Sequence, residues 1–221
     1  MQGPEAHEVT MRKLVCCFII VATALVHGLA QGSRPVPLFD GRSFEGWEGD
    51  TAKTWRIQDG AIVGGSLAER VPQNEFLRTT RSFGDFVLRL KFKLLGNEGF
   101  INAGVQFRSQ PAARPPNEMI GYQADIGAKY WGALYDETRR NKILAEPEPA
   151  VVANLVKLND WNDYEIRAEG PRIRLTLNGR QTVDFTEPDP DIPRTGVIGL
   201  QVHGGGKAEV HYRNISVKEL K

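Results

Sequence analysis

The chain has very little cysteine. Its 221 residues include two cysteines, and both, Cys16 and Cys17, lie in an apolar run near the start, LVCCFIIVATALVHGLA from Leu14 to Ala30. Residues 31–221 therefore have no disulfide, no thiol nucleophile and no cysteine-ligated metal site. A lipoprotein anchor is also disfavoured, because no cysteine stands where this apolar run ends.

The apolar run is short for a membrane span, which needs about 20 apolar residues. It follows the short basic segment Met11–Lys13, and Gly28 and Ala30 provide the small side chains that a signal peptidase requires. We therefore predict a cleaved export signal over residues 1–30, in which residues 1–10 represent an over-extended start. A membrane anchor is the alternative.

Charge of neither sign is in excess. Lysine and arginine number 28 against 27 acidic residues, so the formal net charge is +1. This balance argues against a nucleic-acid partner, which requires a strongly basic surface. After cleavage we expect a linker at residues 31–35 and one domain at residues 36–221, long enough for a sizeable core. The predicted location is periplasmic or extracellular, with no membrane association after cleavage.

Several catalytic signatures are missing. The chain has no Glu-x-Asp-x-x-Glu motif of jelly-roll glucanases, no Gly-x-Ser-x-Gly elbow and no His-Glu-x-x-His zinc motif. Gly206-Lys207 is no phosphate loop, because Gln201 occupies the position of the first glycine. Nothing indicates a nicotinamide or flavin cofactor, although a divalent metal is not excluded. Pro-Asp-Pro-Asp at 188–191 is typical of a rigid turn, with calcium binding as the alternative.

Strand-like alternation covers most of the remaining sequence. In FVLRLKFKL, residues 86–94, phenylalanine and leucine alternate with arginine and lysine, which predicts a strand with one buried face. YEIRAEG and RIRLTLNG show the same pattern and are joined at Gly170-Pro171, so we predict an antiparallel hairpin. Asn178-Gly179 predicts a second hairpin turn, and TGVIGLQVHGGG and AEVHYRNISVKEL supply the last two strands. Short strands with glycine and proline turns predict a sandwich or jelly roll.

Residues 141–158 interrupt this pattern. Pro147 and Pro149 break their first half, whereas residues 150–157 are compatible with a short helix. We expect a short helical excursion here, across one edge of the domain. Other groups are interpreted as structural: a solvated charge cluster of Asp136, Glu137, Arg139 and Arg140, and core or edge-packing tryptophans at positions 47, 55 and 161.

Three segments have an unusual polar face. In INAGVQFR, GYQADIG and GVIGLQVH, apolar side chains alternate with amides, glycines and ionisable groups instead of the threonine, lysine and glutamate typical of a solvent face. Amide and guanidinium groups donate paired hydrogen bonds to neighbouring sugar hydroxyls, and glycines let a sugar ring approach the backbone. We therefore predict a sugar-binding groove whose polar side chains are Asn102, Gln106, Arg108, Gln123, Asp125, Gln201 and His203.

Aromatic side chains near these segments are expected to wall the groove. Trp131 and Tyr135, in KYWGALYDE, suit this role because the CH-rich faces of sugars stack on aromatic rings. Each residue also has an ordinary alternative, since a single histidine on a strand is more often structural or exposed. The groove hypothesis depends on three segments that share one polar bias.

A series of motifs, taken in order, resembles the 3-keto-disaccharide hydrolase family. They are PLFDGRSFEGW, TWRIQDGAIVGG, FGDFVLRLKFKL, NAGVQFRS, GYQADIG, WGALYDETRRN, WNDYEIRAEG, LNGRQTVDF, GLQVHGGG and YRNISVKEL. The resemblance covers residues 36–220. It implies an all-β, concanavalin A/laminarinase-like jelly-roll β-sandwich, export from the cytoplasm, and action on glycosides whose sugar has a ketone at carbon 3.

The resemblance extends to particular positions. Asn102-Ala103-Gly104 is similar to the family's Asn-Ser-Gly element, Arg108 to the arginine that follows it, and Leu200–His203 to its Leu-Gln-x-His element; Gly121-Tyr122-Gln123 and Arg213-Asn214 also match. Ala103 departs from the family by lacking the serine hydroxyl, and Asp125 stands where many relatives have glutamine. These departures leave open a different substrate or a weaker activity.

The implied chemistry is elimination followed by hydration. A ketone at carbon 3 acidifies the hydrogen on carbon 2, so a base can remove it and the bond from carbon 1 to the leaving oxygen then breaks. On this basis we expect His203 or Asp125 to act as base or acid, and Arg108, with Gln201, to stabilise the developing oxyanion. Substrate binding is expected from Asn102, Gln106, Gln123, Tyr135, Gln201 and Trp131. An upstream sugar 3-dehydrogenase would supply the ketone.

Two other functions remain open from the sequence. The same scaffold could serve as a non-catalytic carbohydrate-binding module, in which amides and aromatic rings suffice and ionisable groups are dispensable. It could also be a structural domain of an envelope assembly. The enzyme hypothesis is favoured because a histidine, an aspartate and an arginine share the predicted groove.

Overall fold

The computed structural model describes residues 1–3 and 34–221. Residues 4–30 of the predicted export signal and residues 31–33 of the predicted linker lie outside the described residues, so export stays a prediction. Within the described ranges, no helix combines the length and the apolar character needed to cross a membrane.

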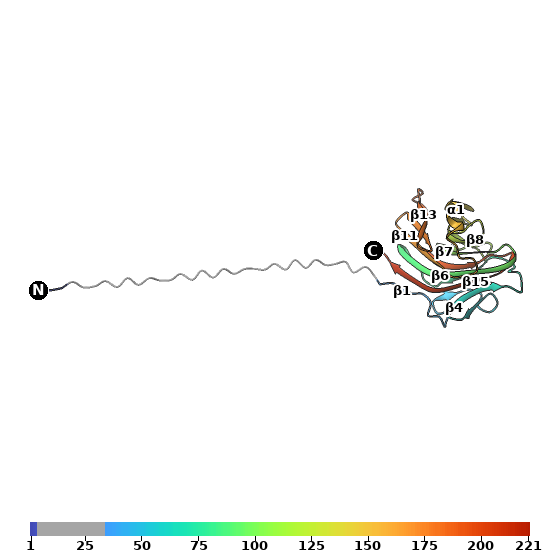
Figure 1. Ribbon diagram of the computed structural model, residues 1–221, viewed down its shortest axis with the longest axis horizontal. Coiled ribbons are helices and arrows are strands. Elements are labelled where there is room, and N and C mark those ends of the chain that lie inside the picture. Colours follow the sequence, from blue (N-terminus) through green and yellow to red (C-terminus); the bar gives the residue numbers. More distant parts are fainter. Residues whose placement is uncertain (4–33) are drawn as a thin grey trace. The chain divides into compact units, whose positions relative to one another are not determined.

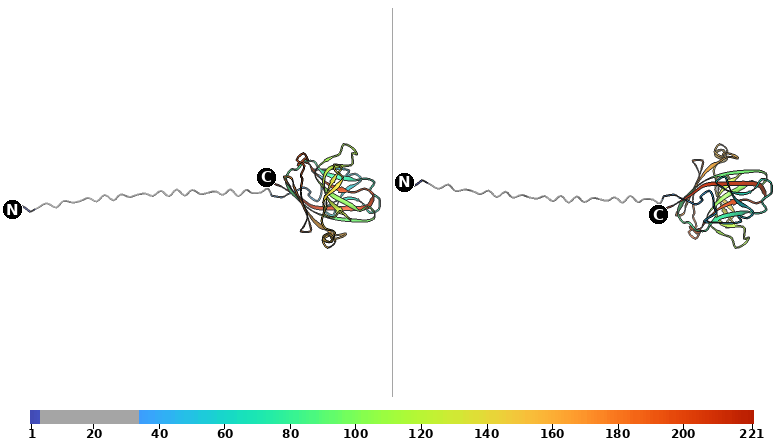
Figure 2. Two further views of the ribbon diagram at one scale, coloured as in Figure 1. Left: turned by 90° about the horizontal axis from the view of Figure 1, so that it is seen from above. Right: turned by 90° about the horizontal axis from the view of Figure 1, so that it is seen from below.

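Two antiparallel sheets form the domain (Figure 1). The eight-stranded one, here called the back sheet, contains the long strands β6 and β15, which lie side by side (Figure 2). Its order is β13 (Arg180–Thr186), β12 (Arg172–Leu177), β11 (Asn162–Glu169), β6 (Phe86–Gly99), β15 (Gly206–Glu219), β4 (Ala61–Ser66) and β3 (Trp55–Gln58), with β1 (Val36–Pro37) also paired to β15.

The seven-stranded sheet, here called the site sheet, has its edges at β10 and β2. Its order is β10 (Lys142–Ala145), β9 (Leu134–Glu137), β8 (Met119–Gly127), β7 (Asn102–Pro111), β14 (Val197–Val202), β5 (Glu75–Thr79) and β2 (Trp47–Glu48). The sandwich of two antiparallel sheets confirms the predicted all-β jelly-roll class.

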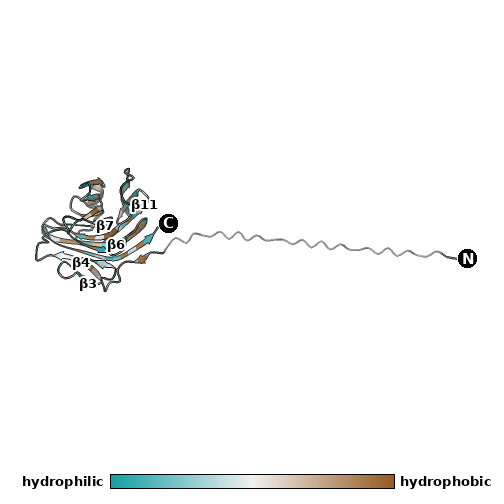
Figure 3. Ribbon diagram, turned by 180° about the vertical axis from the view of Figure 1, so that it is seen from behind, coloured by the Kyte–Doolittle hydropathy of each residue, from teal (hydrophilic) through white to brown (hydrophobic). Residues whose placement is uncertain are grey.

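The core lies between the sheets and follows the predicted alternation. Phe86, Leu88 and Phe92 of β6 are fully buried, as are Val105 and Phe107 of β7. Phe86 and Phe107 meet edge to face across the sandwich, with ring centroids 6.3 Å apart. Each such aromatic side chain contributes roughly 1.5–3 kcal/mol through burial. Apolar and polar residues alternate along these strands (Figure 3).

Both predicted hairpins are present. β11 pairs with β12 from Glu169 opposite Arg172 onward, and the turn between β12 and β13 has positive φ at Asn178 (47°) and Gly179 (81°), as a tight two-residue turn requires. The last two predicted strands, β14 and β15, lie in different sheets. The chain therefore crosses from one sheet to the other immediately after β14.

The region 141–158 differs in part from the prediction. Its first half is not irregular, because Lys142–Ala145 forms β10 and pairs with β9 at the edge of the site sheet. The predicted helix exists but is short: α1 spans Pro149–Ala153. Proline at its start is favourable, since the first helical N–H groups have no partner inside a helix.

The tryptophans agree with a structural role. Trp47 and Trp55 are 6% and 1% exposed and belong to the core. Trp161 packs instead against side chains of β6 and β15 in the back sheet, beneath the guanidinium of Arg213, whose central carbon lies 3.8 Å from the ring centroid.

Candidate functional site

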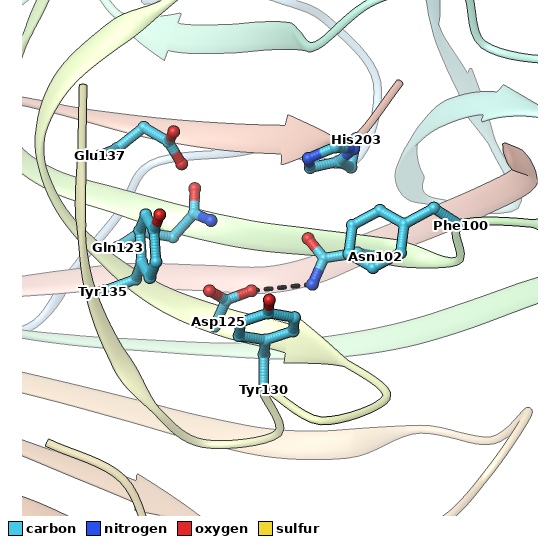
Figure 4. Close-up of a pocket in the computed structure, with 8 residues that line it drawn as sticks. All are labelled: Phe100, Asn102, Gln123, Asp125, Tyr130, Tyr135, Glu137 and His203. Carbon is cyan, nitrogen blue, oxygen red and sulfur yellow. Dashed lines mark hydrogen bonds between the residues drawn. The ribbon is translucent and has the colours of Figure 1, made fainter. Parts of the chain in front are cut away.

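A small polar cavity opens on the site sheet (Figure 4). It encloses about 360 Å³, including space open to solvent, and no lysine or arginine is among its lining residues. Its lining consists of two carboxylates, two amides, a histidine and three aromatic rings, namely Asp125, Glu137, Asn102, Gln123, His203, Phe100, Tyr130 and Tyr135.

Strand alternation places most of this lining. Ala103, Ala124 and Ile126 are fully buried in the core, so their neighbours on β7 and β8 face away from the back sheet and into the cavity. β9 contributes its lining in the same way, and His203 follows the last residue of β14. In Figure 4, Glu137 and His203 approach from opposite sides, while Asp125 lies on β8.

Asp125 is a buried carboxylate without a cationic partner among the residues that the structure describes. Its side chain is 4% exposed, and Oδ1 accepts hydrogen bonds from Asn102 Nδ2 at 2.9 Å and from the Ile126 N–H at 3.2 Å. Burial nevertheless raises its pKa from 3.8 to about 7, because desolvation outweighs these bonds. Asp125 can therefore hold or release a proton near neutral pH.

Glu137 is the second ionisable acid of the cavity. Desolvation raises its pKa from 4.5 to about 7, and the nearby negative charges of Glu118 and Asp125 act in the same direction. Because the two cavity carboxylates repel each other when both are ionised, they titrate as a coupled pair. The pair retains a proton near neutral pH, which an exposed carboxylate would have lost.

His203 supplies a base. Its Nδ1 lies 2.7 Å from the carbonyl oxygen of Gly204. A carbonyl only accepts, so the neutral ring has its proton on Nδ1 and its lone pair on Nε2. Desolvation lowers the pKa of His203 below its usual 6.5, with the bond to Gly204 opposing this effect. At neutral pH the ring is therefore uncharged, with a basic nitrogen available.

Gln106 lies behind Gln123 and orients it. Gln106 Nε2 donates to Gln123 Oε1 at 3.0 Å, and Ser109 Oγ donates to Gln106 Oε1 at 2.6 Å. Gln123 therefore turns its NH₂ group toward the cavity, where it also bonds the Asp125 carboxylate. Gly104 provides the space, since a Cβ there would lie 2.5 Å from Gln123 Cδ. At Gly104, therefore, the space above the backbone is taken by a protein side chain.

Aromatic rings form one wall of the cavity. Phe100 meets the His203 ring edge to face at 4.6 Å and Tyr130 at 6.3 Å, and Tyr130 meets Tyr135 at 6.4 Å. Burial and the nearby Glu137 raise the pKa of Tyr135, so its hydroxyl stays protonated and can donate. Tyr135 lies where the sequence analysis placed it.

The prediction that Arg108 faces the groove is wrong. Its backbone φ is 48°, and the register between β7 and β8 shifts at this point, as in a β-bulge. The bulge breaks the two-residue period, so the guanidinium leaves the cavity face. It donates to the carbonyl oxygens of Gly84 and Gly170 at 2.9 and 2.7 Å and pairs with Asp85 at 2.6 Å. Arg108 therefore ties β7 to turns flanking the back sheet.

Gln201 and Trp131 also lie outside this cavity lining. Gln201 is fully buried on β14, and within the described residues neither amide atom has a hydrogen-bond partner. Trp131 stacks on Phe92, with ring centroids 6.2 Å apart, and lines a separate cavity with Pro147 and Pro149. Their predicted direct contact with a sugar in the cavity is therefore not supported by their positions.

The predicted solvated charge cluster is instead built around a buried carboxylate. Asp136 is fully buried and accepts hydrogen bonds from both Arg139 and Arg140. Arg140 also bonds Glu187 at 2.7 Å, and Tyr122 OH donates to Glu187 at 2.6 Å. Burial acts to raise the pKa of Glu187, but these bonds lower it to about 2. The cluster anchors β9, which carries two residues of the cavity wall.

Sequence reasoning missed three lining residues. Glu137 could have been found, because it lies two positions after Tyr135 on one strand and so shares its face. Phe100 and Tyr130 lie in connections, where alternation carries no information. Within residues 1–3 and 34–221, no group of three or more histidine, cysteine, aspartate or glutamate side chains is arranged to hold a metal ion.

Comparison with known proteins agrees with the sandwich. The family model for a 3-keto-alpha-glucoside-1,2-lyase-like domain matches residues 34–218. A predicted glycosyl hydrolase from Parabacteroides distasonis is similar in structure. Its TM-score is 0.61, with 21% identity over 87% of this chain and 95% of the other. Carbohydrate-binding module CBM66 from Bacillus subtilis is also similar, with a TM-score of 0.59 and 21% identity over 79% of this chain and 96% of the other.

A protein of unknown function with a galectin-like fold from Bacillus subtilis has a TM-score of 0.60 and 12% identity, over 84% of this chain and 94% of the other. At these identities the structural likeness establishes the fold alone. No curated protein gave a significant match.

Proposed function

The chain belongs to the family of 3-keto-alpha-glucoside-1,2-lyase-like domains, and from this premise we propose that its cavity cleaves glycosides whose sugar has a ketone at carbon 3. One observation carries the proposal. A neutral histidine and two carboxylates with pKa values of about 7 converge on one small cavity without a cation. Such a set provides a base and an acid at the same pH.

The reaction begins at carbon 2. His203 Nε2 takes the proton that the neighbouring ketone acidifies, and the electron pair delocalises onto the carbon 3 oxygen. The electron pair then returns to make the bond between carbons 1 and 2 a double bond as the bond from carbon 1 to the leaving oxygen breaks, and the leaving oxygen takes a proton. Water next adds its hydroxyl to carbon 1 while a proton returns to carbon 2, so the net reaction is hydrolysis.

The carboxylate pair suits the acid step. Asp125 and Glu137 share a proton near neutral pH, so one of them can protonate the leaving oxygen. The carbon 3 oxyanion requires neutral donors, since no cation lines the cavity. Gln123 Nε2 and the Tyr135 hydroxyl have this chemistry, and Asn102 holds Asp125 in place.

A specific observation favours carbohydrate binding without turnover as the second candidate. Phe100, Tyr130 and Tyr135 form a nearly continuous aromatic wall, which is how many sugar sites gain affinity. Under this alternative the cavity holds a sugar, and neutralising its carboxylates leaves affinity unchanged.

The test uses the purified protein with 3-keto-trehalose and with plain trehalose, following glucose release with and without EDTA. We expect release from the keto sugar alone, with a rate that rises as His203 loses its proton below pH 6.5 and falls as the carboxylate pair loses its proton near pH 7. The EDTA arm tests for a metal requirement.

Variants sharpen the test. His203→Gln should abolish release, whereas His211→Gln, which changes a histidine of β15 on the back sheet, should retain it. No release from either sugar, together with thermal stabilisation by sugar, would favour the binding alternative. The substrate also requires an oxidation of carbon 3 before cleavage, and we propose a sugar 3-dehydrogenase acting upstream.

A further inference from the structure

A chain of hydrogen bonds from outside the cavity ends at the ring of His203. Glu118 Oε1 accepts from Asn74 Nδ2 at 2.9 Å, and Asn74 Oδ1 accepts from the Gly204 N–H at 3.0 Å. Gly204 in turn accepts from His203 Nδ1 at 2.7 Å. The chain joins segments that precede β5, precede β8 and follow β14.

The partners determine how the Asn74 amide is turned. A backbone N–H only donates, so the Asn74 oxygen must face Gly204. The NH₂ group then faces Glu118, whose carboxylate accepts it. Reversing the amide would set its NH₂ against the Gly204 N–H and its oxygen against the carboxylate. Glu118 therefore selects the amide orientation that holds Gly204.

Glu118 has a buried carboxylate oxygen that lowers the stability of the fold. Its Oε2 is buried and has no hydrogen-bond partner within the described residues, and desolvation raises its pKa above 4.5. Leaving such an oxygen unpaired costs about 1–3 kcal/mol, and native structures contain few such groups. This unpaired oxygen destabilises the fold, so a contribution to stability does not explain why a glutamate occupies this position.

Gly204 has little freedom to move. A Cβ at this position would lie 2.6 Å from the backbone of Gln73, so the turn packs directly on the segment that contains Asn74. The next residue, Gly205, donates its N–H to the Val71 carbonyl at 2.7 Å. This close packing places the Asn74 side chain directly against the turn whose carbonyl accepts the His203 proton.

We propose that Asn74 and Glu118 are positioning residues that hold the Gly204 carbonyl so that His203 keeps its proton on Nδ1 and presents the lone pair of Nε2 to the substrate. The catalytic consequence rests on the proposed function, whereas the position of the proton is a property of the free protein. Neither residue lines the cavity itself.

The test exchanges donor and acceptor. Asn74→Asp sets two carboxylates against each other, and the double variant Asn74→Asp with Glu118→Gln restores one acid and one amide with the same total charge. In the double variant the amide introduced by Glu118→Gln can donate to the carboxylate introduced by Asn74→Asp, whose other oxygen accepts from the Gly204 N–H. Gln73→Ala is the matched control at the neighbouring position, because within the described part of the chain that side chain donates to Glu75, at 3.0 Å, and takes no part in the hydrogen bonds that lead to His203.

The readout is the ¹⁵N spectrum of the histidine rings in the full chain, assigned with His203→Gln, because it distinguishes Nδ1–H from Nε2–H directly. We expect Nδ1–H in the native protein and in Gln73→Ala, loss of that form in Asn74→Asp, and its return in the double variant. On a 3-keto-glycoside, Asn74→Asp should lower kcat at least about tenfold with KM within about twofold.

Two results would overturn the proposal. One is a native Nδ1–H signal in a folded Asn74→Asp variant, with unfolding midpoints showing that it folds. The other is a double variant that folds but does not recover the signal. If the tautomer follows the exchange while the native protein cleaves no keto sugar, the positioning role stands and the proposed function fails.

Discussion

Neutralising Asp125 should stabilise the protein, and the effect should depend on pH. The pKa of Asp125 is about 7 in the fold against 3.8 for an exposed group, because the buried carboxylate is desolvated. One pKa unit corresponds to 1.36 kcal/mol, so ionising Asp125 within the fold costs about 4 kcal/mol. A raised acid pKa means that this cost is absent below pH 4, grows between pH 4 and 7, and is complete above pH 7.

Asp125→Asn removes that charge and keeps an oxygen for the Asn102 amide and the Ile126 N–H. We expect the variant to be more stable than the native protein by about 4 kcal/mol at pH 8, which is a rise in Tm of about 8–16 °C, and equally stable at pH 4. Urea unfolding across this pH range measures it. Such a gain would accompany a loss of activity.

Asp163→Asn is the matched control. Asp163 also lies on a strand, but its carboxylate is exposed and pairs with Lys91, so its change should shift stability by less than about 1 kcal/mol. A stability difference between Asp125→Asn and the native protein that stays constant from pH 4 to pH 8 would refute the reasoning.

Three further predictions concern neighbouring positions. Glu137→Gln should lower the cleavage rate below pH 7, measured as a pH–rate profile, because the coupled pair loses one carboxyl group and an amide cannot protonate the leaving oxygen; an unchanged profile would exclude Glu137 as the acid. Arg108→Ala should cost about 3 kcal/mol in urea unfolding, because two carbonyls and Asp85 lose their donor, while kcat and KM of the folded protein stay unchanged. A selective rise in KM would return Arg108 to the site. Gly104→Ala should clash with Gln123 and weaken sugar binding at least about fivefold in calorimetry, and unchanged affinity would show that Gln123 makes no contact with the sugar.

Much of the cavity lining could be predicted from strand alternation alone. Asn102, Gln123, Asp125 and His203 were predicted from strand parity and all line it, since the period of two is a property of any regular strand. Parity fails wherever a strand is irregular. Arg108 was misplaced because a bulge turns its side chain to the other face, and bulges leave little trace in a single sequence.

Packing decided other positions. Gln106 and Gln201 face the predicted way, yet one lies behind Gln123 and the other is fully buried, because neighbouring side chains cover them. Asp136 and its arginines looked solvated, since a sequence of charges does not reveal that Glu187, distant along the chain, completes a buried network. Burial depends on contacts between segments far apart in the sequence.

The sequence by itself determined the all-β class, the hairpins, the family and one polar face, because these follow from periods and motifs that are local. The tertiary structure decided which polar side chains share a cavity and in which protonation state. Glu137, Phe100 and Tyr130 come together only when the sheet and its connections are formed. The pKa values near 7 likewise arise from desolvation, which no linear pattern contains.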